Sequence, residues 1–155
     1  MAKTTITVRQ AIPSDSAQVS HLYNQLVVDV GIRVLPSRIA SISQDPNTAL
    51  FVCELDGTVR ATALVSLCSD VMYGFQPFAV LENVVVDASV RGSGVGELLL
   101  GHIEVYGQAK DCSKIMLLSS ANRADAHRFF VRAGFAGSTK RGFVKYRRDF
   151  AGSSA

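Results

Sequence analysis

A glycine-rich turn between two apolar segments most restricts how this chain can fold. Ahead of it stand Val84, Val85 and Val86, and three β-branched residues in a row predict a strand buried on both faces. The turn itself reads Arg91-Gly92-Ser93-Gly94-Val95-Gly96. After it, apolar residues recur at helical spacing at Val95, Leu98, Leu99 and Ile103. Glycines let the backbone approach a ligand closely, and the first turn of a helix leaves N–H groups unpaired, so the unit predicts a phosphate-binding site.

The glycine spacing separates this turn from two familiar nucleotide-binding loops. No G-x-x-x-x-G-K-[ST] run is present, so a Walker loop is excluded. A Rossmann fingerprint fails because Leu99 stands where its third glycine belongs. The pattern present is R-x-x-G-x-G, at Arg91, Gly94 and Gly96. By itself it also fits a glycine-rich turn that feeds a helix in any α/β protein.

The composition predicts one globular domain over residues 1–150 and a disordered tail over residues 151–155. Hydrophobic residues make up 48% of the 155 residues and charged residues 19%. The net charge of +3 is too small by itself to argue for nucleic acid. Three widely separated cysteines favour neither a disulfide framework nor a zinc site, so we expect no metal and a reducing cytoplasm. No apolar run reaches about 18 residues, so we expect no membrane span.

Alternation and helical spacing predict the elements on either side of the turn. Before it, they are a strand over residues 4–11, a helix from Ser14 to Gly31, a helix over residues 35–42, and strands over residues 49–55 and 58–67. The first helix has its apolar face at Val19, Leu22, Tyr23, Leu26, Val27 and Val30. Asp56-Gly57 predicts a hairpin between the two later strands.

From the turn onward, the predicted elements continue in alternation. They are a helix over residues 94–110, a strand over residues 114–118, a helix over residues 122–133, a segment that begins at Phe135, and a final strand over residues 142–150. A strand–helix–strand unit therefore lies between antiparallel pieces, which predicts a mixed α/β fold.

Two segments are open to more than one interpretation. The loop over residues 69–78 contains Met72, Tyr73, Phe75 and Phe78, which either line a substrate pocket or fold onto the core. A basic run contains Lys140, Arg141, Lys145, Arg147 and Arg148. Because this run lacks a recognition helix and an aromatic platform, we expect no nucleic-acid binding. It is either a solvated strand face or a contact for a phosphate or an anionic substrate.

Four sequence blocks between residues 77 and 135 carry a family resemblance. They read P-F-A-V-L-E-N-V-V-V-D, R-G-S-G-V-G-E-L-L-L, C-S-K-I-M-L-L and A-N-R-A-D-A-H-R-F-F-V-R-A-G-F. In order and spacing the chain resembles the GNAT superfamily of N-acetyltransferases, strongly over residues 77–135 and weakly before residue 50. It is most similar to small bacterial members and, more distantly, to glucosamine-phosphate acetyltransferases. The resemblance implies a mixed sheet that splays between its fourth and fifth strands, flanked by about four helices.

The resemblance also implies acetyl-CoA as cofactor and assigns residues to it. The N–H of Val84 would polarise the thioester carbonyl, and the Val86 backbone would pair with the pantetheine arm, with Val85 between them. The pyrophosphate would lie on the N–H groups of Arg91, Gly92, Ser93, Gly94, Val95 and Gly96. Asn122 matches the family's cofactor-arm asparagine, and Phe129 and Phe130 would pack beside the thiol.

The implied reaction is direct acetyl transfer to the primary amine of a small molecule, and Glu82 is the candidate general base. By period two, Glu82 shares a strand face with Val84, so its carboxylate would point toward the acetyl group. Alternatively, Glu82 pairs with a basic residue or binds substrate ammonium without acting as a base. Tyr73, Phe75 and Phe78 join Glu82 as candidate substrate-binding residues. A small-molecule amine and a second copy, in a homodimer, are the expected partners.

One position departs from the family pattern. Many members have F-Y where this chain has Phe129-Phe130, so the tyrosine that protonates the leaving thiolate is absent. Either Tyr73, Tyr146 or solvent supplies the proton, or the thiolate leaves unassisted, or the protein binds acetyl-CoA without efficient turnover. A non-catalytic acyl-CoA-binding or regulatory domain is therefore an alternative, as is an enzyme that acts on a protein or peptide amine.

Overall fold

The computed structural model describes residues 3–153. The chain divides into two compact units, Met1–Leu117 and Leu118–Ala155. The elements of the first unit are β1 (Ile6–Gln10), α1 (Ser16–Leu26), α2 (Pro36–Ser43), β2 (Thr48–Leu55), β3 (Thr58–Cys68), β4 (Phe78–Val86), α3 (Val95–Ala109) and β5 (Ile115–Leu117). Short 3-10 turns, η1 (Pro13–Asp15) and η2 (Ala88–Val90), precede α1 and α3. The second unit contains α4 (Ala124–Arg132) and the turn η3 (Arg147–Asp149).

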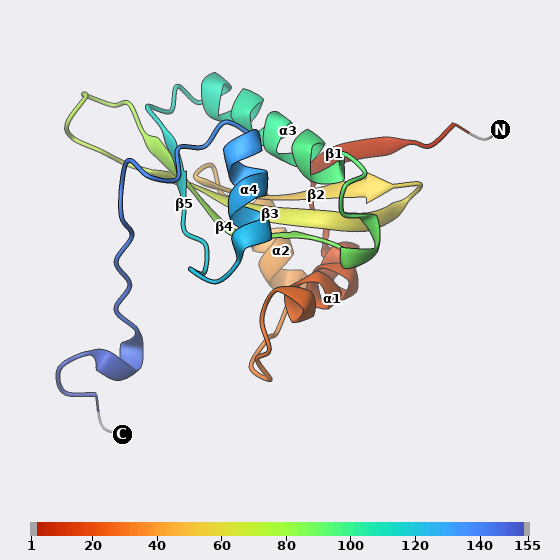
Figure 1. Cartoon of the computed structure of the whole chain (residues 1–155), viewed down its shortest axis with the longest axis horizontal. Helices are drawn as coiled ribbons and strands as arrows, with labels where there is room; N and C mark the ends of the chain where they lie inside the picture. The colour runs from red at the N-terminus through yellow and green to blue at the C-terminus, as the bar shows by residue number, and fades with distance from the viewer. Residues whose placement is uncertain (1–2, 154–155) are drawn as a thin grey trace. The chain divides into compact units, whose positions relative to one another are not determined.

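One five-stranded sheet, in the order β1-β2-β3-β4-β5, is the frame of the first unit (Figure 1). Neighbouring strands from β1 to β4 pair antiparallel, and β5 joins β4 in parallel. The hairpin between β2 and β3 turns at Asp56 and Gly57, whose φ angles are 51° and 80°. Two left-handed residues in succession match the twist of the flanking strands, which is why Asp-Gly is favoured there. The predicted hairpin is confirmed.

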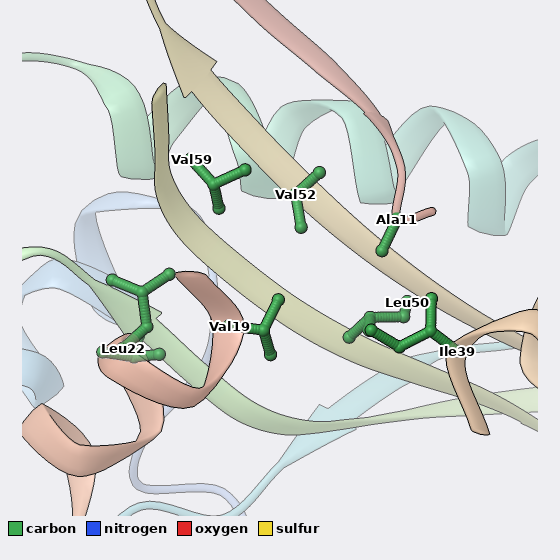
Figure 2. Close-up of a cluster of buried hydrophobic side chains, with 8 residues drawn as sticks. Ala11, Val19, Leu22, Ile39, Leu50, Val52 and Val59 are labelled. Carbon is green, nitrogen blue, oxygen red and sulfur yellow. The ribbon is translucent and has the colours of Figure 1, made fainter. Parts of the chain in front are cut away.

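Helices cover both faces of this sheet, with α1 and α2 on one face and α3 on the other (Figure 1). The core between the sheet and these two helices includes Ala11, Val19, Leu22, Ile39, Leu50, Val52, Val59 and Val85 (Figure 2). Phe51 lies between two of them on β2, so alternation directs its side chain to the opposite face. There its ring meets His102 and Tyr106 of α3 edge-on, with centroids 5.1 and 5.2 Å apart. The middle of the sheet is therefore buried on both faces.

The first helix is shorter than predicted. α1 ends at Leu26, and Val27 has an extended backbone with φ −140° and ψ 152°. Val27 and Val30, which the sequence pattern placed on the apolar face of this helix, are exposed. Two β-branched residues in succession at positions 27 and 28 lose side-chain freedom in a helix, which favours its end at this point. Gly31 therefore lies in a loop and does not end the helix.

The final strand predicted over residues 142–150 is absent from the described part of the second unit. Residues 142–146 have no assigned strand pairing, and the 3-10 turn Arg147–Asp149 replaces the rest of the predicted final strand. A strand needs a neighbouring strand for its backbone groups, and strand propensity alone does not provide one. Of the tail that we expected to be disordered, residues 154 and 155 lie outside the described residues, while the Ser153 N–H donates to Phe150 O at 3.1 Å.

Candidate active site

The fourth and fifth strands separate soon after they meet. Their parallel pairing covers three residue pairs, Ala79–Ile115, Val80–Met116 and Leu81–Leu117. β4 continues to Val86, but β5 ends at Leu117. Within the described residues of the first unit, the far half of β4 therefore has no strand on its β5 side. The predicted splay between the fourth and fifth strands is confirmed.

A β-bulge lies in β4 just where the two strands part. Glu82 stands opposite Leu64 and Val85 stands opposite Thr62, so β4 has one more residue than β3 between these pairs. Asn83 follows Glu82 directly and has a φ angle of 54°, in the left-handed region. Asparagine is among the few residues other than glycine that adopt this conformation readily, so the residue type suits the bulge.

The bulge corrects the geometry that we predicted for Glu82. Period-two alternation put Glu82 and Val84 on one face, but the extra residue shifts the alternation. The ladder instead places Glu82 on the same face as Val85, whose side chain is buried in the core beneath α1. Glu82 itself is exposed. Its carboxylate therefore lies on the α1 side of the sheet and in contact with solvent, not in a half-apolar cleft.

A tyrosine of α1 adjoins the bulge. Tyr23 packs against the core beneath α1, and Asn83 is the polar group next to its hydroxyl. Burial raises the pKa of Tyr23, and the polar side chain of Asn83 beside it offsets part of that rise. The sequence pattern placed Tyr23 on the apolar face of the first helix and predicted no polar contact for it. Its helical spacing gave no indication that the hydroxyl would reach a strand some sixty residues along the chain.

The turn after β4 is held by a buried carboxylate. Asp87 caps η2, and its Oδ1 accepts hydrogen bonds from the Ser89 N–H at 2.9 Å and the Ser89 hydroxyl at 2.7 Å. Its Oδ2 lies 3.4 Å from Arg60 Nη1. The hydrogen bonds from Ser89 and the nearby charge of Arg60 lower the pKa of Asp87, although burial opposes the shift. Asp87 thus remains ionised and fixes the chain just before the glycine-rich turn.

The glycine-rich turn leads into α3 as predicted, with one N–H group already in use. Gly92 and Gly94 have φ angles of 81° and 90°, and Gly94 is the N-cap of α3. The N–H groups of Gly94, Val95 and Gly96 lie where no preceding helical turn can accept them. The Ser93 N–H, by contrast, donates to Val90 O at 3.2 Å, so it is not available to a phosphate in this conformation.

The remaining residue of the turn folds back onto β4. Arg91 is exposed, and its Nε donates to Val86 O at 3.3 Å. Val86 is the residue whose backbone the resemblance assigns to the pantetheine arm. A carbonyl oxygen has two lone pairs, so this contact occupies the Val86 carbonyl only in part.

The expected substrate loop is exposed. Tyr73 and Phe75 are exposed, at 60% and 105% of the reference area, which rules out the alternative that this loop folds onto the core. Phe78 begins β4, half-buried, with Lys114 Nζ 5.4 Å from its ring centroid. An open groove of about 400 Å³ lies between Ile6 and Val8 of β1 and Leu98 and other residues of α3.

The second unit contains the other predicted cofactor residues. Phe130 is buried, with the rings of Phe129 and Phe135 at centroid distances of 5.3 and 6.0 Å. Phe129 is half-buried, and Asn122 is exposed in the turn before α4. Phe130 therefore belongs to an aromatic cluster of this unit. Tyr146, one of the suggested proton donors, is also in this unit. Its ring centroid lies 4.5 Å from the guanidinium carbon of Arg148.

Two kinds of feature are absent from residues 3–153. No helix there is long and apolar enough to cross a membrane. No group of three or more His, Cys, Asp or Glu side chains in that range is placed to hold a metal ion.

A sequence comparison identifies the family to which this sheet, bulge and glycine-rich turn belong. The sequence profile of the Acetyltransferase (GNAT) family matches residues 19–135. The chain belongs to this family. Family membership confirms the predicted fold, N-acetyltransferase activity and the use of acetyl-CoA as acetyl donor.

Similar proteins of known sequence or structure agree with this assignment. An aminoglycoside N(6′)-acetyltransferase type 1 from Stenotrophomonas maltophilia is 28% identical over 131 residues, which cover 83% of this chain and 85% of that protein. A putative acetyltransferase structure from Agrobacterium tumefaciens has a TM-score of 0.82 at 27% identity, covering 91% of this chain and 99% of that one. A glucosamine-6-phosphate N-acetyltransferase from Arabidopsis thaliana shares the fold, with a TM-score of 0.79 at 22% identity and coverage of 92% and 99%.

Proposed function

We propose that this protein transfers the acetyl group of acetyl-CoA to a primary amine of a small molecule, by direct attack, with Glu82 as the general base. The observation that carries the proposal is the place where β4 leaves β5. Pairing ends at Leu81, and Glu82 is the next residue. A free strand edge, a carboxylate and a glycine-rich helix start thus follow one another within residues 82–96. Acetyl-CoA supplies the activated acetyl group.

The residues of the first unit fit a phosphorylated, strand-like cofactor. Backbone groups of Val84, Val85 and Val86 lie on the part of β4 that lacks a β5 partner, so an extended pantetheine arm can pair with them. The N-terminal end of α3 offers N–H groups and the positive end of the helix dipole to pyrophosphate. Gly92 and Gly94 have left-handed φ angles, and no atom lies within 4 Å of where a Cβ would stand on either. We assign the pyrophosphate to the N–H groups of residues 91–96. The Ser93 N–H either breaks its hydrogen bond to Val90 O when the pyrophosphate binds or does not contact the pyrophosphate.

The same proposal covers residues of the second unit. Asn122 would contact the cofactor arm, and Phe129 and Phe130 would lie near the thiol. The Phe130 ring also packs against Phe129 and Phe135. The thiolate proton then comes from solvent or from another phenol, with exposed Tyr73 as a candidate.

Glu82 is suited to take a proton from the attacking amine. Amines in water are largely protonated, so a base must act before or during attack. An exposed carboxylate also attracts a cationic amine, and it can accept the proton directly or through water. The Val84 N–H, on the bulge beside it, would stabilise the negative charge that develops on the acetyl oxygen.

The acceptor that we propose is a small cationic amine, and aminoglycosides are the first compounds to try. This choice is supported by the relative named as an aminoglycoside N(6′)-acetyltransferase, at 28% identity. Exposed Tyr73 and Phe75, with Phe78 and Glu82, are the proposed contacts. We further propose a single domain over residues 1–150 and a homodimer. A cytoplasmic location is supported by three free cysteines, Cys53, Cys68 and Cys112.

An amine-panel assay tests the proposed function. Release of free coenzyme A thiol would be measured with acetyl-CoA and aminoglycosides, glucosamine 6-phosphate, polyamines and a short peptide with a free N-terminus. We expect amine-dependent thiol release with at least one small cationic amine and none with the peptide. Thiol release with the peptide alone would favour a protein acceptor. Tight acetyl-CoA binding without turnover on any amine would favour a non-catalytic domain.

A further inference from the structure

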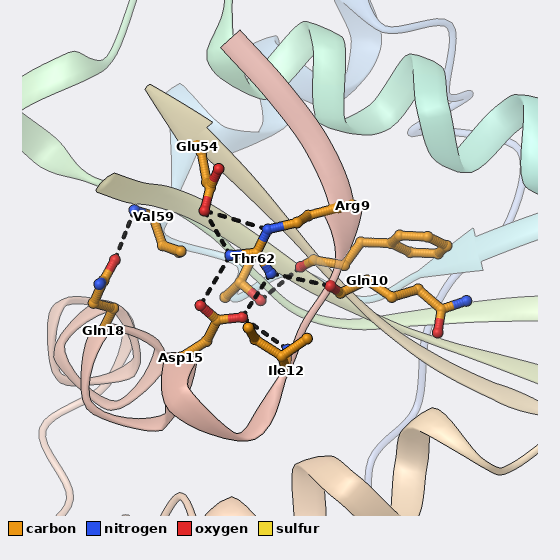
Figure 3. A network of polar contacts seen from close by, with 9 residues as sticks. Arg9, Gln10, Ile12, Asp15, Gln18, Glu54, Val59 and Thr62 are labelled. Carbon is orange, nitrogen blue, oxygen red and sulfur yellow. Dashed lines mark hydrogen bonds and ion pairs between the residues drawn. The ribbon is translucent and has the colours of Figure 1, made fainter. Parts of the chain in front are cut away.

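Two glutamines fasten α1 to the backbone of the sheet. Gln18 Oε1 accepts the Val59 N–H at 2.7 Å, near the start of β3 (Figure 3). Gln25 Oε1 accepts the Ala88 N–H at 2.9 Å, just after the end of β4. The two glutamines are seven positions apart, which is close to two helical turns, so they project from the same face of α1. One helix is therefore tied to β3 and to the turn after β4 by the same type of bond.

The bond from Ala88 satisfies a donor that its own turn cannot. Ala88 is the first residue of η2, and the N–H groups at the start of a helical turn have no acceptor within it. The N-cap side chain of Asp87 is committed to Ser89, as described above. Gln25, 63 residues earlier in the chain, provides the acceptor for Ala88 instead. The entry to the glycine-rich turn is thus anchored from outside by α1.

The Gln25 amide nitrogen has a neighbour on α1. This nitrogen, Nε2, lies 3.1 Å from His21 Nε2, one helical turn earlier. An amide nitrogen can only donate, so this contact is a hydrogen bond when His21 Nε2 is the unprotonated ring nitrogen. This contact directs the amide oxygen away from His21 and toward Ala88. In this conformation both ends of the Gln25 amide therefore have a partner, with the oxygen at Ala88 and the nitrogen at His21.

We propose that Gln25 is a positioning residue for acetyl-CoA, which acts through Ala88 and η2 on the placement of residues 91–96. The inference rests on the proposed pyrophosphate role of those residues. η2 lies between the end of β4 and Gly94, the N-cap of α3. A shift of η2 against α1 changes the distance between the free edge of β4 and the N–H groups of α3. Both ends of one cofactor must fit that distance, so Gln25 affects affinity for the cofactor without touching it.

The hydrogen bonds of the two glutamines differ in solvent exposure, so we expect their loss to affect stability differently. The Gln25–Ala88 bond is exposed, so water can replace Gln25 as the acceptor, and loss of the side chain then costs little stability. The Gln18–Val59 bond is partly buried, so its loss leaves a donor that water reaches less easily. Gln18 is therefore a matched control, with the same residue type, the same helix and the same kind of bond at a site away from the turn.

The experiment compares three glutamine variants of the full chain. Gln25→Met and Gln18→Met keep side-chain length and helix propensity but remove the acceptor. Gln25→Glu keeps an acceptor for Ala88, and raised ionic strength screens its added charge. The acetyl-CoA dissociation constant by calorimetry, KM and kcat with a saturating amine, and the melting temperature are measured for each. Gly94→Asp is added, because it tests whether residues 91–96 bind acetyl-CoA at all.

The expected result is a separation of affinity from stability. Gln25→Met should weaken acetyl-CoA binding and raise its KM about 3- to 10-fold, the scale of one lost hydrogen bond, with kcat and melting temperature nearly unchanged. Gln18→Met should lower the melting temperature and leave affinity within about twofold. Gln25→Glu should restore most of the affinity at raised ionic strength.

Two results would overturn the proposal. One is acetyl-CoA affinity in Gln25→Met that equals the wild-type or Gln18→Met value while Gly94→Asp abolishes binding. The other is a Gln25→Glu variant that remains as weak as Gln25→Met at every ionic strength. If Gly94→Asp binds acetyl-CoA normally in a folded protein, the assignment of residues 91–96 fails instead, and the Gln25 proposal fails with it.

Discussion

Both terminal nitrogens of the Arg9 guanidinium contact the carboxylate of Asp15, at 2.8 and 3.0 Å (Figure 3). The same guanidinium reaches Glu54 of β2, and the Asp15 carboxylate also accepts the Ile12 N–H at 2.8 Å. Asp15 is buried, with a side-chain exposure of 6%. This arrangement joins β1, β2 and the turn that leads into α1. It therefore sets where α1, with its two glutamines, begins.

Replacing Asp15 should destabilise the protein and change its response to acid. Burial alone would raise the pKa of Asp15, but hydrogen bonds from Arg9 and Ile12 and the charge of Arg9 outweigh it and lower the pKa. The stabilisation is therefore present above the unfolded pKa of about 3.9 and is lost as pH falls through the lower folded pKa. Asp15→Asn should lower the free energy of unfolding by about 1–3 kcal/mol at neutral pH, measured by urea denaturation.

The difference between Asp15→Asn and wild type should shrink as pH falls below about 4. Asp125→Asn is the control, because Asp125 pairs with Arg128 on the exposed surface of α4, where an ion pair contributes little. Equal destabilisation by the two variants, or a difference that does not depend on pH, would contradict the assigned role of Asp15.

Substitution of Gly94 should remove acetyl-CoA binding from a folded protein. Gly94 has a φ angle of 90°, so any other residue is strained there by about 1–3 kcal/mol. Gly94→Asp also places a negative charge at the helix end that we assign to pyrophosphate. Calorimetry should detect no binding, while circular dichroism retains the helical signal. Gly101→Asp, at an exposed helical glycine with no atom within 4 Å of where its Cβ would stand, is the control and should bind normally.

Removal of the Glu82 carboxylate should slow the reaction without changing cofactor affinity. Glu82→Gln keeps the size of the side chain but cannot accept a proton, so kcat should fall about 100-fold or more. The acetyl-CoA dissociation constant should stay within about twofold, because Glu82 lies on the α1 face and not at the phosphate end. Glu104→Gln, at an exposed glutamate of α3, should be active. A Glu82→Gln rate within a few-fold of wild type at all pH values would exclude Glu82 as the base.

A tyrosine at position 130 should lower stability more than it helps catalysis. Phe130 is 7% exposed and lies among other phenylalanine rings, so an added hydroxyl lacks a partner. Phe130→Tyr should therefore cost about 1–3 kcal/mol, with no increase in turnover. Phe129→Tyr is the control, because Phe129 is half-buried and water can reach its hydroxyl. A rise in turnover with unchanged melting temperature would instead place a proton donor at position 130.

The central part of the fold was predictable because its signals are local and strong. Asp56-Gly57 specifies a two-residue hairpin through backbone preference alone. The glycines at 92 and 94 mark left-handed positions before a helix, and the apolar spacing behind them continues through α3. These signals act within a few residues, so the chain around the proposed cofactor site could be read without knowledge of the fold.

The geometry within the site depends on contacts that local patterns do not encode. Alternation would make position 83 a core position between Leu81 and Val85, yet it holds asparagine, and this exception was the only available sign of the bulge. The Gln25–Ala88 bond spans 63 residues and follows from the placement of α1 on the sheet. The prediction of a final strand was wrong for the same reason. Residues 142–150 have a strand-like composition but no partner strand in the described part of their own unit.

The half of β4 that has no β5 partner among the described residues of the first unit also bears on association between chains. An open strand edge is a template on which a second polypeptide can associate, and proteins usually guard such edges. Here the stretch begins with the charged Glu82 and the left-handed Asn83, and a bulge bends the backbone away from the flat path that a regular strand would need. We therefore expect the bulge to disfavour edge-to-edge pairing with a second chain, because a regular strand needs a flat partner edge.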